Sequence, residues 1–101
     1  MRDAELYGGL IRLHILHHAS EEPVFGLGII EELRRHGYNL SAGTLYPMLH
    51  SMEKAGYLRS VAKQVNGKMR RNYSITPKGK AVLSAGKDKV RELFGELFED
   101  E

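Results

Sequence analysis

The dipeptide Asn66-Gly67 stands between two strand-like runs, residues 57–65 and 68–75. Asn-Gly in this position is the strongest short-range signal for a β-hairpin, because both residues tolerate the positive φ angles of a two-residue turn. Such a turn places Val65 opposite Lys68 and fixes the register of the pair. The fold must therefore hold a hairpin with two unlike faces, one of Leu58, Ala62, Met69, Tyr73 and Ile75, interrupted by Arg71, and one of Arg59, Lys63, Lys68 and Arg70.

Helical periodicity dominates the chain before the hairpin. The first helix is predicted from about Asp3 to about Ala19. A helix that is apolar on two sides must bury both, so one side is expected to meet a partner subunit. The two stripes are Leu6, Leu10, Leu13 and Leu16, and Tyr7, Ile11 and Ile15.

A second helix is predicted over residues 26–35, after a break at Pro23. Its inner face is expected to consist of Leu27, Ile30 and Leu33. Gly37 follows as a C-terminal cap, since glycine adopts the left-handed conformation that ends many helices.

The third helix should begin after Ser41, whose hydroxyl can accept from the free amides of the next turn, and should end at about Ala55. Pro47 lies in its second turn and offers no amide, so the start of this helix is expected to be irregular. Helix, short glycine-containing turn and helix form the helix-turn-helix pattern. A hairpin directly after it is the wing of a winged helix, which predicts a mainly α fold with a small β-hairpin wing.

The last helix has a clear start, with Thr76 as N-cap and Pro77 in the first helical position. A heptad-like seam along it asks for a partner helix, expected to be the first helix of another subunit. We therefore expect residues 1–76 to form the winged domain and residues 77–101 to form a dimerisation helix. The predicted dimer contacts are Tyr7, Ile11, Ile15, Leu83, Val90, Leu93, Phe94, Leu97 and Phe98.

Charge is distributed unevenly along the 101 residues, although the formal net charge is only +2. Residues 54–87 contain nine Lys or Arg residues and no Asp or Glu. Lys63 is expected directly opposite Arg70, and like charges opposed across strands are destabilising unless an anionic partner faces them. This pattern favours a polyanion as the partner. Without cysteine, disulfides and thiolate metal sites are excluded, and without an apolar run long enough for a membrane span a cytoplasmic location is expected.

Three segments carry a family resemblance: GLIRLHILH, EEPVFGLGIIEELRRHGYNLSAGTLYPMLHSMEKAGYL and NYSITPKGKAVL. With them the chain resembles the PadR family of winged-helix transcriptional regulators, and Gly-Thr-Leu-Tyr-Pro is the most specific match. The resemblance implies a homodimer in which the first and last helices of both subunits interlock. It also implies operator binding by two helix-turn-helix units, and in several members release of the DNA by a small aromatic compound.

With a single predicted helix after the wing, the chain resembles the short subfamily of these regulators. Some short members hold flat ligands between tryptophans of the last helix, but this sequence has no tryptophan, so Phe94 and Phe98 would have to substitute. A pocket for such an effector is expected between the first and last helices, lined by Tyr7, Ile11, Phe94 and Phe98.

The polar side of the third helix is predicted to enter the major groove of duplex DNA. Its expected contacts are Ser41, Gly43, Thr44, Tyr46, Pro47, His50 and Lys54. A core position for Tyr46 is an equally good interpretation. The wing bases predicted to follow the minor groove or its phosphates are Lys63, Lys68, Arg70 and Arg71.

Other functions are less well supported. His14 and His18 are one helical turn apart, with His17 and Glu21 nearby, and this spacing can chelate a metal; because histidines in helices more often serve other roles, no metal site or cofactor is assigned. No nucleophile, glycine-rich phosphate loop or Ser-His-Asp group can be placed, so an enzyme is not expected. The alternative is a winged helix that binds protein or RNA without operator specificity.

Overall fold

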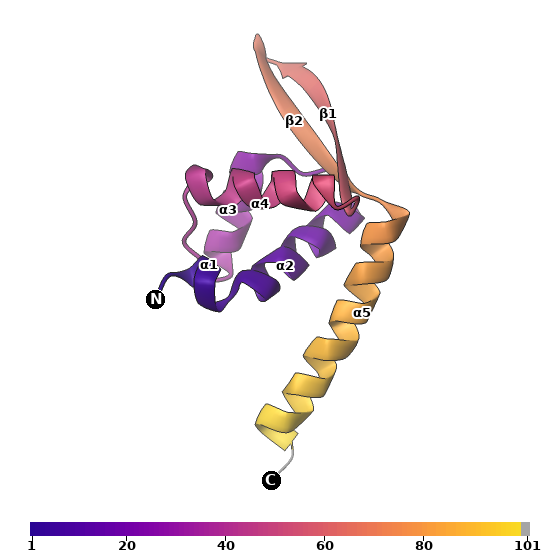
Figure 1. Ribbon diagram of the computed structural model, residues 1–101. Coiled ribbons are helices and arrows are strands. Elements are labelled where there is room, and N and C mark those ends of the chain that lie inside the picture. Colours follow the sequence, from indigo (N-terminus) through magenta and orange to yellow (C-terminus); the bar gives the residue numbers. More distant parts are fainter. Residues whose placement is uncertain (100–101) are drawn as a thin grey trace.

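A computed structural model describes residues 1–99 of the chain. Helix α1 (Asp3–Leu6) and α2 (Gly8–Glu21) precede the pair α3 (Gly26–Arg35) and α4 (Ala42–Lys54). Strands β1 (Leu58–Val65) and β2 (Lys68–Ile75) form a hairpin, followed by α5 (Pro77–Phe94) and one turn of π-helix, η1 (Gly95–Glu99). Figure 1 shows that α2, α3 and α4 form a compact body, while the hairpin and α5 project from one end of it in different directions. The predicted fold class, mainly helical with a hairpin wing, is confirmed.

The first predicted helix is two helices, because the chain bends at Tyr7 (φ −109°, ψ 18°) before Gly8-Gly9. The bend folds α1 onto the segment between α3 and α4. The Asn39 amide donates to the Asp3 carboxylate at 3.0 Å, and the Tyr7 ring packs edge-on against Tyr38 with centroids 5.9 Å apart. Two contacts between residues far apart in the sequence thus hold a turn that the continuous helical periodicity did not indicate.

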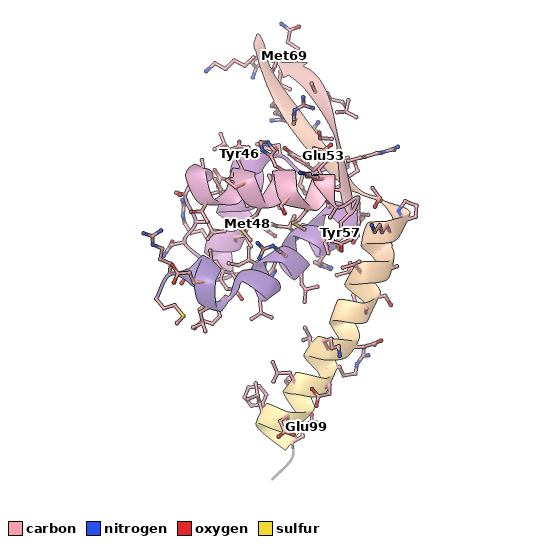
Figure 2. All side chains as sticks on the ribbon, in the orientation of Figure 1. Tyr46, Met48, Glu53, Tyr57, Met69 and Glu99 are labelled. Atoms are coloured by element: carbon pink, nitrogen blue, oxygen red, sulfur yellow. The ribbon has the colours of Figure 1, made fainter. Side chains whose placement is uncertain are left out.

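The hydrophobic core lies between α2 on one side and the α3–α4 pair on the other, closed by the base of the hairpin and the start of α5. Ile11 and Ile15 of α2 are completely buried in it, with Leu33, Leu45 and Leu49. In Figure 2 Met48 points from α4 into the space above α2. Each such buried side chain contributes about 1.5–3 kcal/mol, so these positions fix how the three helices pack.

The phase of α3 differs from the prediction at one residue. Leu27 is 61% exposed, while Ile29 is buried in its place beside Ile30 and Leu33. The reason is a close approach at Gly26, where any Cβ would collide with the Tyr46 ring. Because α4 crosses over the glycine, the neighbouring Leu27 is turned out of the core.

The predicted caps are confirmed. The Ser41 hydroxyl accepts from the Thr44 amide at 3.2 Å, and the Thr76 hydroxyl accepts from the Gly79 amide at 3.0 Å. Gly37 and Gly56 have φ angles of +92° and +87°, the left-handed values that end α3 and α4. The expected irregularity at Pro47 is not found, because α4 is continuous from Ala42 to Lys54.

The hairpin has the predicted register, with Val65 opposite Lys68 and Lys63 opposite Arg70. Asn66 and Gly67 have φ angles of +51° and +78°. Val24 forms an isolated antiparallel β-bridge with Tyr73: its amide donates to the Tyr73 carbonyl at 2.9 Å and its carbonyl accepts from the Tyr73 amide at 2.7 Å. These two hydrogen bonds tie the base of the hairpin to the segment before α3.

Helix α5 begins in the core and ends outside it. Leu83 is buried, and Gly86 approaches α2 so closely that a Cβ there would collide with Leu13. The far end of α5 and η1 project away from the body in Figure 1, with exposed apolar side chains. None of the helices within residues 1–99 is both long and apolar enough to cross a membrane.

Candidate nucleic-acid interface

The outer side of α4 carries one exposed stripe. Gly43, Pro47, His50 and Lys54 follow each other at intervals of one helical turn, and all four are exposed. The opposite side of α4 consists of Leu45, Met48, Leu49 and Met52, all buried. The buried side thus fixes the position of α4. The exposed stripe, whose one charged residue is Lys54, is free to lie against another molecule.

Ser41 and Thr44, two of the predicted DNA contacts at the start of α4, form hydrogen bonds with each other. The Ser41 hydroxyl lies 3.3 Å from the Thr44 hydroxyl, in addition to capping the Thr44 amide. Ser41 remains exposed, but Thr44 is half-buried. This pair keeps the first turn rigid and leaves the first helical amides open to an outside acceptor.

Tyr46 combines both interpretations made from the sequence. Its ring lies against Gly26 at the start of α3, yet the residue is still 36% exposed. It lines a groove of about 640 Å³ between α4 and the wing, shared with Leu27, His50, Lys68, Met69 and Arg70. Figure 2 shows Tyr46 on the wing side of α4 and Met69 at the wing tip, at the two ends of this concave surface.

The four predicted wing bases are all exposed. The Arg70 guanidinium lies 3.9 Å from the centre of the Phe25 ring, a cation–π contact that holds the arginine beside the start of α3. Arg71 donates to the Ser60 hydroxyl at 3.2 Å. Lys63 and Lys68 have no ion pair with any residue in the described part of the chain, so their charges face solvent.

Glu53 joins α4 to the wing, a role that its position in the sequence did not reveal. Its carboxylate accepts from the Ser60 amide at 2.9 Å and from the Ser60 hydroxyl at 2.8 Å. Figure 2 shows Glu53 at the base of the hairpin. Arg71 binds the same hydroxyl, so one acid positions a wing arginine through one serine.

Five residues that shape this surface were not predicted: Phe25, Leu27, Glu53, Ser60 and Val24. Leu27 was predicted on the inner face of its helix with Ile30 and Leu33, and the helical pattern gave no sign that it faces this surface. The other four depend on contacts between α4, the hairpin and the segment before α3, which periodicity within one element does not report.

The predicted dimer contacts divide into two groups. Ile11 and Ile15 are completely buried in the core of the protomer and leave no surface for a partner, so their prediction as partner contacts is wrong. Leu83 is also buried but lines the groove between α2 and α5, and its contact with a partner stays a prediction. Tyr7 is exposed but already packs on Tyr38. The remaining residues are exposed along the far end of α5 and η1: Val90, Leu93, Phe94, Leu97 and Phe98.

A groove of about 490 Å³ lies between α2 and α5, where the effector pocket was expected. Its walls are mainly apolar, with Leu10, Leu13, Val90 and Phe94 among them. Of the four residues predicted to line it, only Phe94 does so. Ile11 is buried beneath α2, Tyr7 packs on Tyr38, and Phe98 lies beyond the lining, 5.1 Å from the Phe94 ring.

Burial shifts the pKa values of three side chains. Burial, reinforced by the neighbouring imidazole of His36, lowers the pKa of His14. Burial also lowers the pKa of His18, against the opposing effect of the Glu32 carboxylate. Burial raises the pKa of Tyr73, so this phenol at the wing base stays neutral at physiological pH.

Comparisons with known proteins agree with this geometry. The sequence model of the PadR-like family of transcriptional regulators matches residues 15–85. The transcriptional regulator Rv3488 of Mycobacterium tuberculosis is 45% identical over 94 residues, which are 93% of this chain and 88% of that protein.

Solved structures show the same fold. A PadR family transcriptional regulator from Eggerthella lenta superposes with a TM-score of 0.82 at 30% identity, covering 96% of this chain and 88% of the other. A PadR-like transcriptional regulator from Bacillus cereus gives 0.80 at 29% identity, covering 96% and 99%. These relatives are regulators and not enzymes, which agrees with the absence of a catalytic group in the sequence. With its family match and winged helix-turn-helix fold, the chain belongs to the PadR family of DNA-binding transcriptional regulators.

Proposed function

We propose that this protein is a homodimeric, ligand-responsive repressor that binds a palindromic operator. The observation that carries the proposal is the exposed stripe of α4 beside a wing whose charges are all positive. A B-DNA major groove is about 12 Å wide and admits an α-helix, with its basic neighbours lying along the flanking phosphates.

The first turn of α4 is suited to close approach. Gly43 and Ala42 are small and exposed, so the backbone of the helix start can come near a phosphate. Thr44 presents its hydroxyl near this end, while His50 and Lys54 lie two and three turns further along. We assign base contacts to the start of α4 and phosphate contacts to its end, with Tyr46 and Pro47 lying between them.

The wing supplies charge. Arg70, held by Phe25, is preorganised to lie along a phosphate or a narrow minor groove. Lys63 and Lys68 lie on the same hairpin face as Arg70, with Lys68 beside the turn, and Arg71 adds a positive charge on the other face. Opposed like charges at Lys63 and Arg70 cost stability in the free protein, and bound DNA would reverse that cost.

The dimer supplies symmetry. Two copies related by a two-fold axis would present two α4 helices to two half-sites of a palindrome. Exposed apolar side chains at the far end of α5 and η1, with Leu6 and Leu10 of α1 and α2, support this axis as the meeting place. Residues 1–76 then carry DNA recognition and residues 77–101 carry association, although the first half of α5 also completes the core.

The groove between α2 and α5 supports a flat, apolar effector. It lies beside the proposed dimer surface, so a compound bound there would alter how two subunits meet and hence the spacing of their α4 helices. That coupling would release the operator.

Fluorescence anisotropy tests the proposal. The probe is the DNA upstream of the protein's own coding region, compared with a random duplex at two salt concentrations. Sequence-dependent binding with a steep salt slope is expected. Weak, equal binding to both duplexes, followed by failure to select any site from a random library, would favour the alternative, a protein- or RNA-binding winged helix.

Two variants separate the assigned roles. Thr44→Ala should weaken operator binding more than random binding, whereas Arg70→Ala should weaken both and reduce the salt slope by about one. Thr44→Ser, which keeps the hydroxyl beside Ser41, is the matched control for helix capping. Equal losses for both alanine variants on both duplexes would contradict this division.

A further inference from the structure

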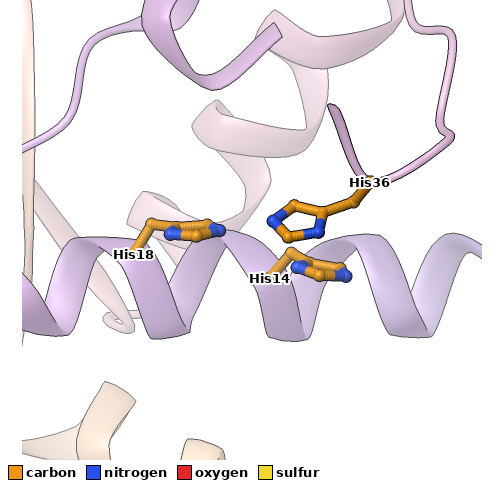
Figure 3. A group of neighbouring side chains, drawn as sticks. All are labelled: His14, His18 and His36. Atoms are coloured by element: carbon orange, nitrogen blue, oxygen red, sulfur yellow. The ribbon is translucent and has the colours of Figure 1, made fainter. Parts of the chain in front are cut away.

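Three imidazoles meet at a place that lies apart from the proposed DNA-binding surface. His14 and His18 are one turn apart on α2, and His36 at the C-terminal cap of α3 folds over them. Figure 3 shows the three rings facing one another across the two helices. One ring nitrogen of each lies within 4.8 Å of the others. The sequence indicated only the first two, because His36 is brought in by the packing of α3 on α2.

His18 has an unusual environment for a structural histidine. Its Nε2 atom is buried and has no hydrogen-bond partner in the described part of the chain, while its Nδ1 atom lies 3.7 Å from Oε1 of Glu32. An unpaired buried nitrogen costs about 1–3 kcal/mol, so such atoms are rare. One ring nitrogen toward a carboxylate and the other free is the arrangement of a metal-ligating histidine.

Glu32 is itself positioned by its neighbours. Arg35 donates to Oε2 at 2.5 Å, which leaves Oε1 toward His18 Nδ1 and His36 Nε2, at 3.7 and 3.9 Å. The acid therefore serves two of the three histidines at once. Such an outer carboxylate fixes the tautomer and ring orientation of metal ligands and raises their basicity.

We propose that His14, His18 and His36 bind a divalent transition-metal ion of the class that prefers imidazole nitrogen, such as Zn²⁺ or Ni²⁺, with Glu32 as the supporting carboxylate. Three histidine nitrogens with a water or carboxylate oxygen complete a four-coordinate site. Tetrahedral ligands at about 2.05 Å from zinc lie about 3.4 Å apart. The nitrogens need to move inward by on the order of 1 Å.

The orientation of the rings has to change before all three histidines can bind one ion. The rings are now stacked, with centroids of His14 and His36 4.6 Å apart and planes 29° from parallel. Lone pairs of parallel rings do not converge, so binding requires the rings to turn about their side-chain torsions. His36 is exposed and lies at the end of a helix, which gives it the freedom to do so.

A second group, His17, His18 and Glu21, shares His18 and therefore competes with this site. Its two other members are exposed and all three belong to α2. That group closes only a local loop on one helix, whereas the first spans two helices and uses the buried, unpaired Nε2 of His18. The geometry favours the group that includes His36.

The position of the site links it to regulation, a step that rests on the proposed function. An ion would clamp α2 to the end of α3, the helix that precedes α4, while His14 also lines the groove between α2 and α5. The clamp would fix the angle between the DNA-reading pair and the proposed dimer surface. Metal binding is therefore expected to change operator affinity.

Calorimetric titration of the full chain, without a polyhistidine tag and after stripping with chelator, tests the site with Zn²⁺, Ni²⁺ and, as a control ion, Mg²⁺. One Zn²⁺ or Ni²⁺ per protomer, a higher Tm and no response to Mg²⁺ are expected. His14→Ala and His36→Asn should weaken binding by about tenfold or more. His17→Ala and His50→Ala, which change histidines outside the site, should not.

Two calorimetric results would overturn the site: no binding of either ion, or binding that His17→Ala abolishes and His36→Asn leaves intact. Because His36 is exposed, its variant should fold and remain informative. Operator anisotropy with and without ion forms the second arm, and a shift of about threefold or more that His36→Asn removes is expected. Operator binding that ignores a bound ion overturns the coupling alone, whereas a metal site in a protein that binds no operator overturns the proposed function alone.

Discussion

The wing tip and the far end of α5 are the two parts of the molecule that project from the core, and they differ in what they expose. Figure 1 shows both leaving the body from the same region. The wing carries Lys63, Lys68, Arg70 and Arg71, whereas α5 and η1 end in Val90, Leu93, Phe94, Leu97 and Phe98. A positively charged projection suits a polyanion, and an apolar one suits another protein surface.

The wing and α5 leave the body at one junction, which hydrogen bonds hold together. The Thr76 hydroxyl donates to the Gly56 carbonyl, and the Thr76 amide donates to the Tyr57 carbonyl at 3.1 Å. Tyr73 of β2 is buried and forms the β-bridge with Val24. Figure 2 shows Tyr57 at this junction. One rigid joint therefore sets the direction of both projections, and damage to it should affect DNA binding and association together.

The largest effect is expected from Gly79→Ala at the joint. A Cβ there would collide with the Tyr57 carbonyl and lie 2.8 Å from Cγ1 of Ile75, neither of which is a flexible chain end. Overpacking against backbone should lower the free energy of unfolding by about 2–3 kcal/mol, measured by urea denaturation at fixed protein concentration. Gly95→Ala meets nothing within 4 Å and should change it by less than about 1 kcal/mol. Equal losses would mean that the joint is not rigid.

The next largest effect is expected from Phe94→Ala, which changes only the apolar far end of α5. Phe94 packs on Phe98 but is otherwise exposed, so its removal should leave the folded protomer stable and weaken the dimer by about 2 kcal/mol. Sedimentation equilibrium measures the change, with Lys89→Ala on the same helix as the control. A wild-type protein that stays monomeric at every concentration would remove the contrast between the two projections.

Local signals in the sequence predicted the joint and the hairpin well. Asn66-Gly67, Thr76-Pro77 and Ser41 each dictate the conformation of their own backbone, so turn, cap and register followed from a few neighbouring residues. The exposed stripe of α4 was predictable for the same reason, because helical spacing alone separates Leu45 and Leu49 from His50 and Lys54.

Contacts between elements were beyond the reach of such signals. Ile11 and Ile15 were correctly predicted to be buried, but only the packed body shows that their own protomer covers them. Leu27 was misplaced because Tyr46 occupies the space over Gly26. His36 joins the two histidines of α2 only after α3 has folded back. In each case the sequence pattern does not show which other element packs against a given face of a helix.

A smaller effect is expected from Glu53→Gln, which loosens the wing without removing a base. The substitution keeps the shape but weakens two hydrogen bonds from Ser60, at 2.8 and 2.9 Å, that a carboxylate accepts more strongly than an amide. The free energy of unfolding should fall by about 1 kcal/mol, with faster amide exchange at Ser60. Glu31→Gln, on the exposed side of α3, should change neither quantity. An unchanged exchange rate would show that Glu53 does not help to hold the wing.

The smallest effect is expected from Lys68→Ala at the wing tip, where the side chain is exposed and supports nothing in the fold. Stability should not change, because no ion pair in the described residues is lost. Affinity for operator and random DNA should fall together, and the slope of log affinity against log salt should decrease by about one, since one phosphate contact disappears. Lys89→Ala removes the same charge from the apolar projection and should leave that slope unchanged. If both lysines reduce it equally, DNA responds to the net charge of the protein, and the two projections do not divide their partners between them.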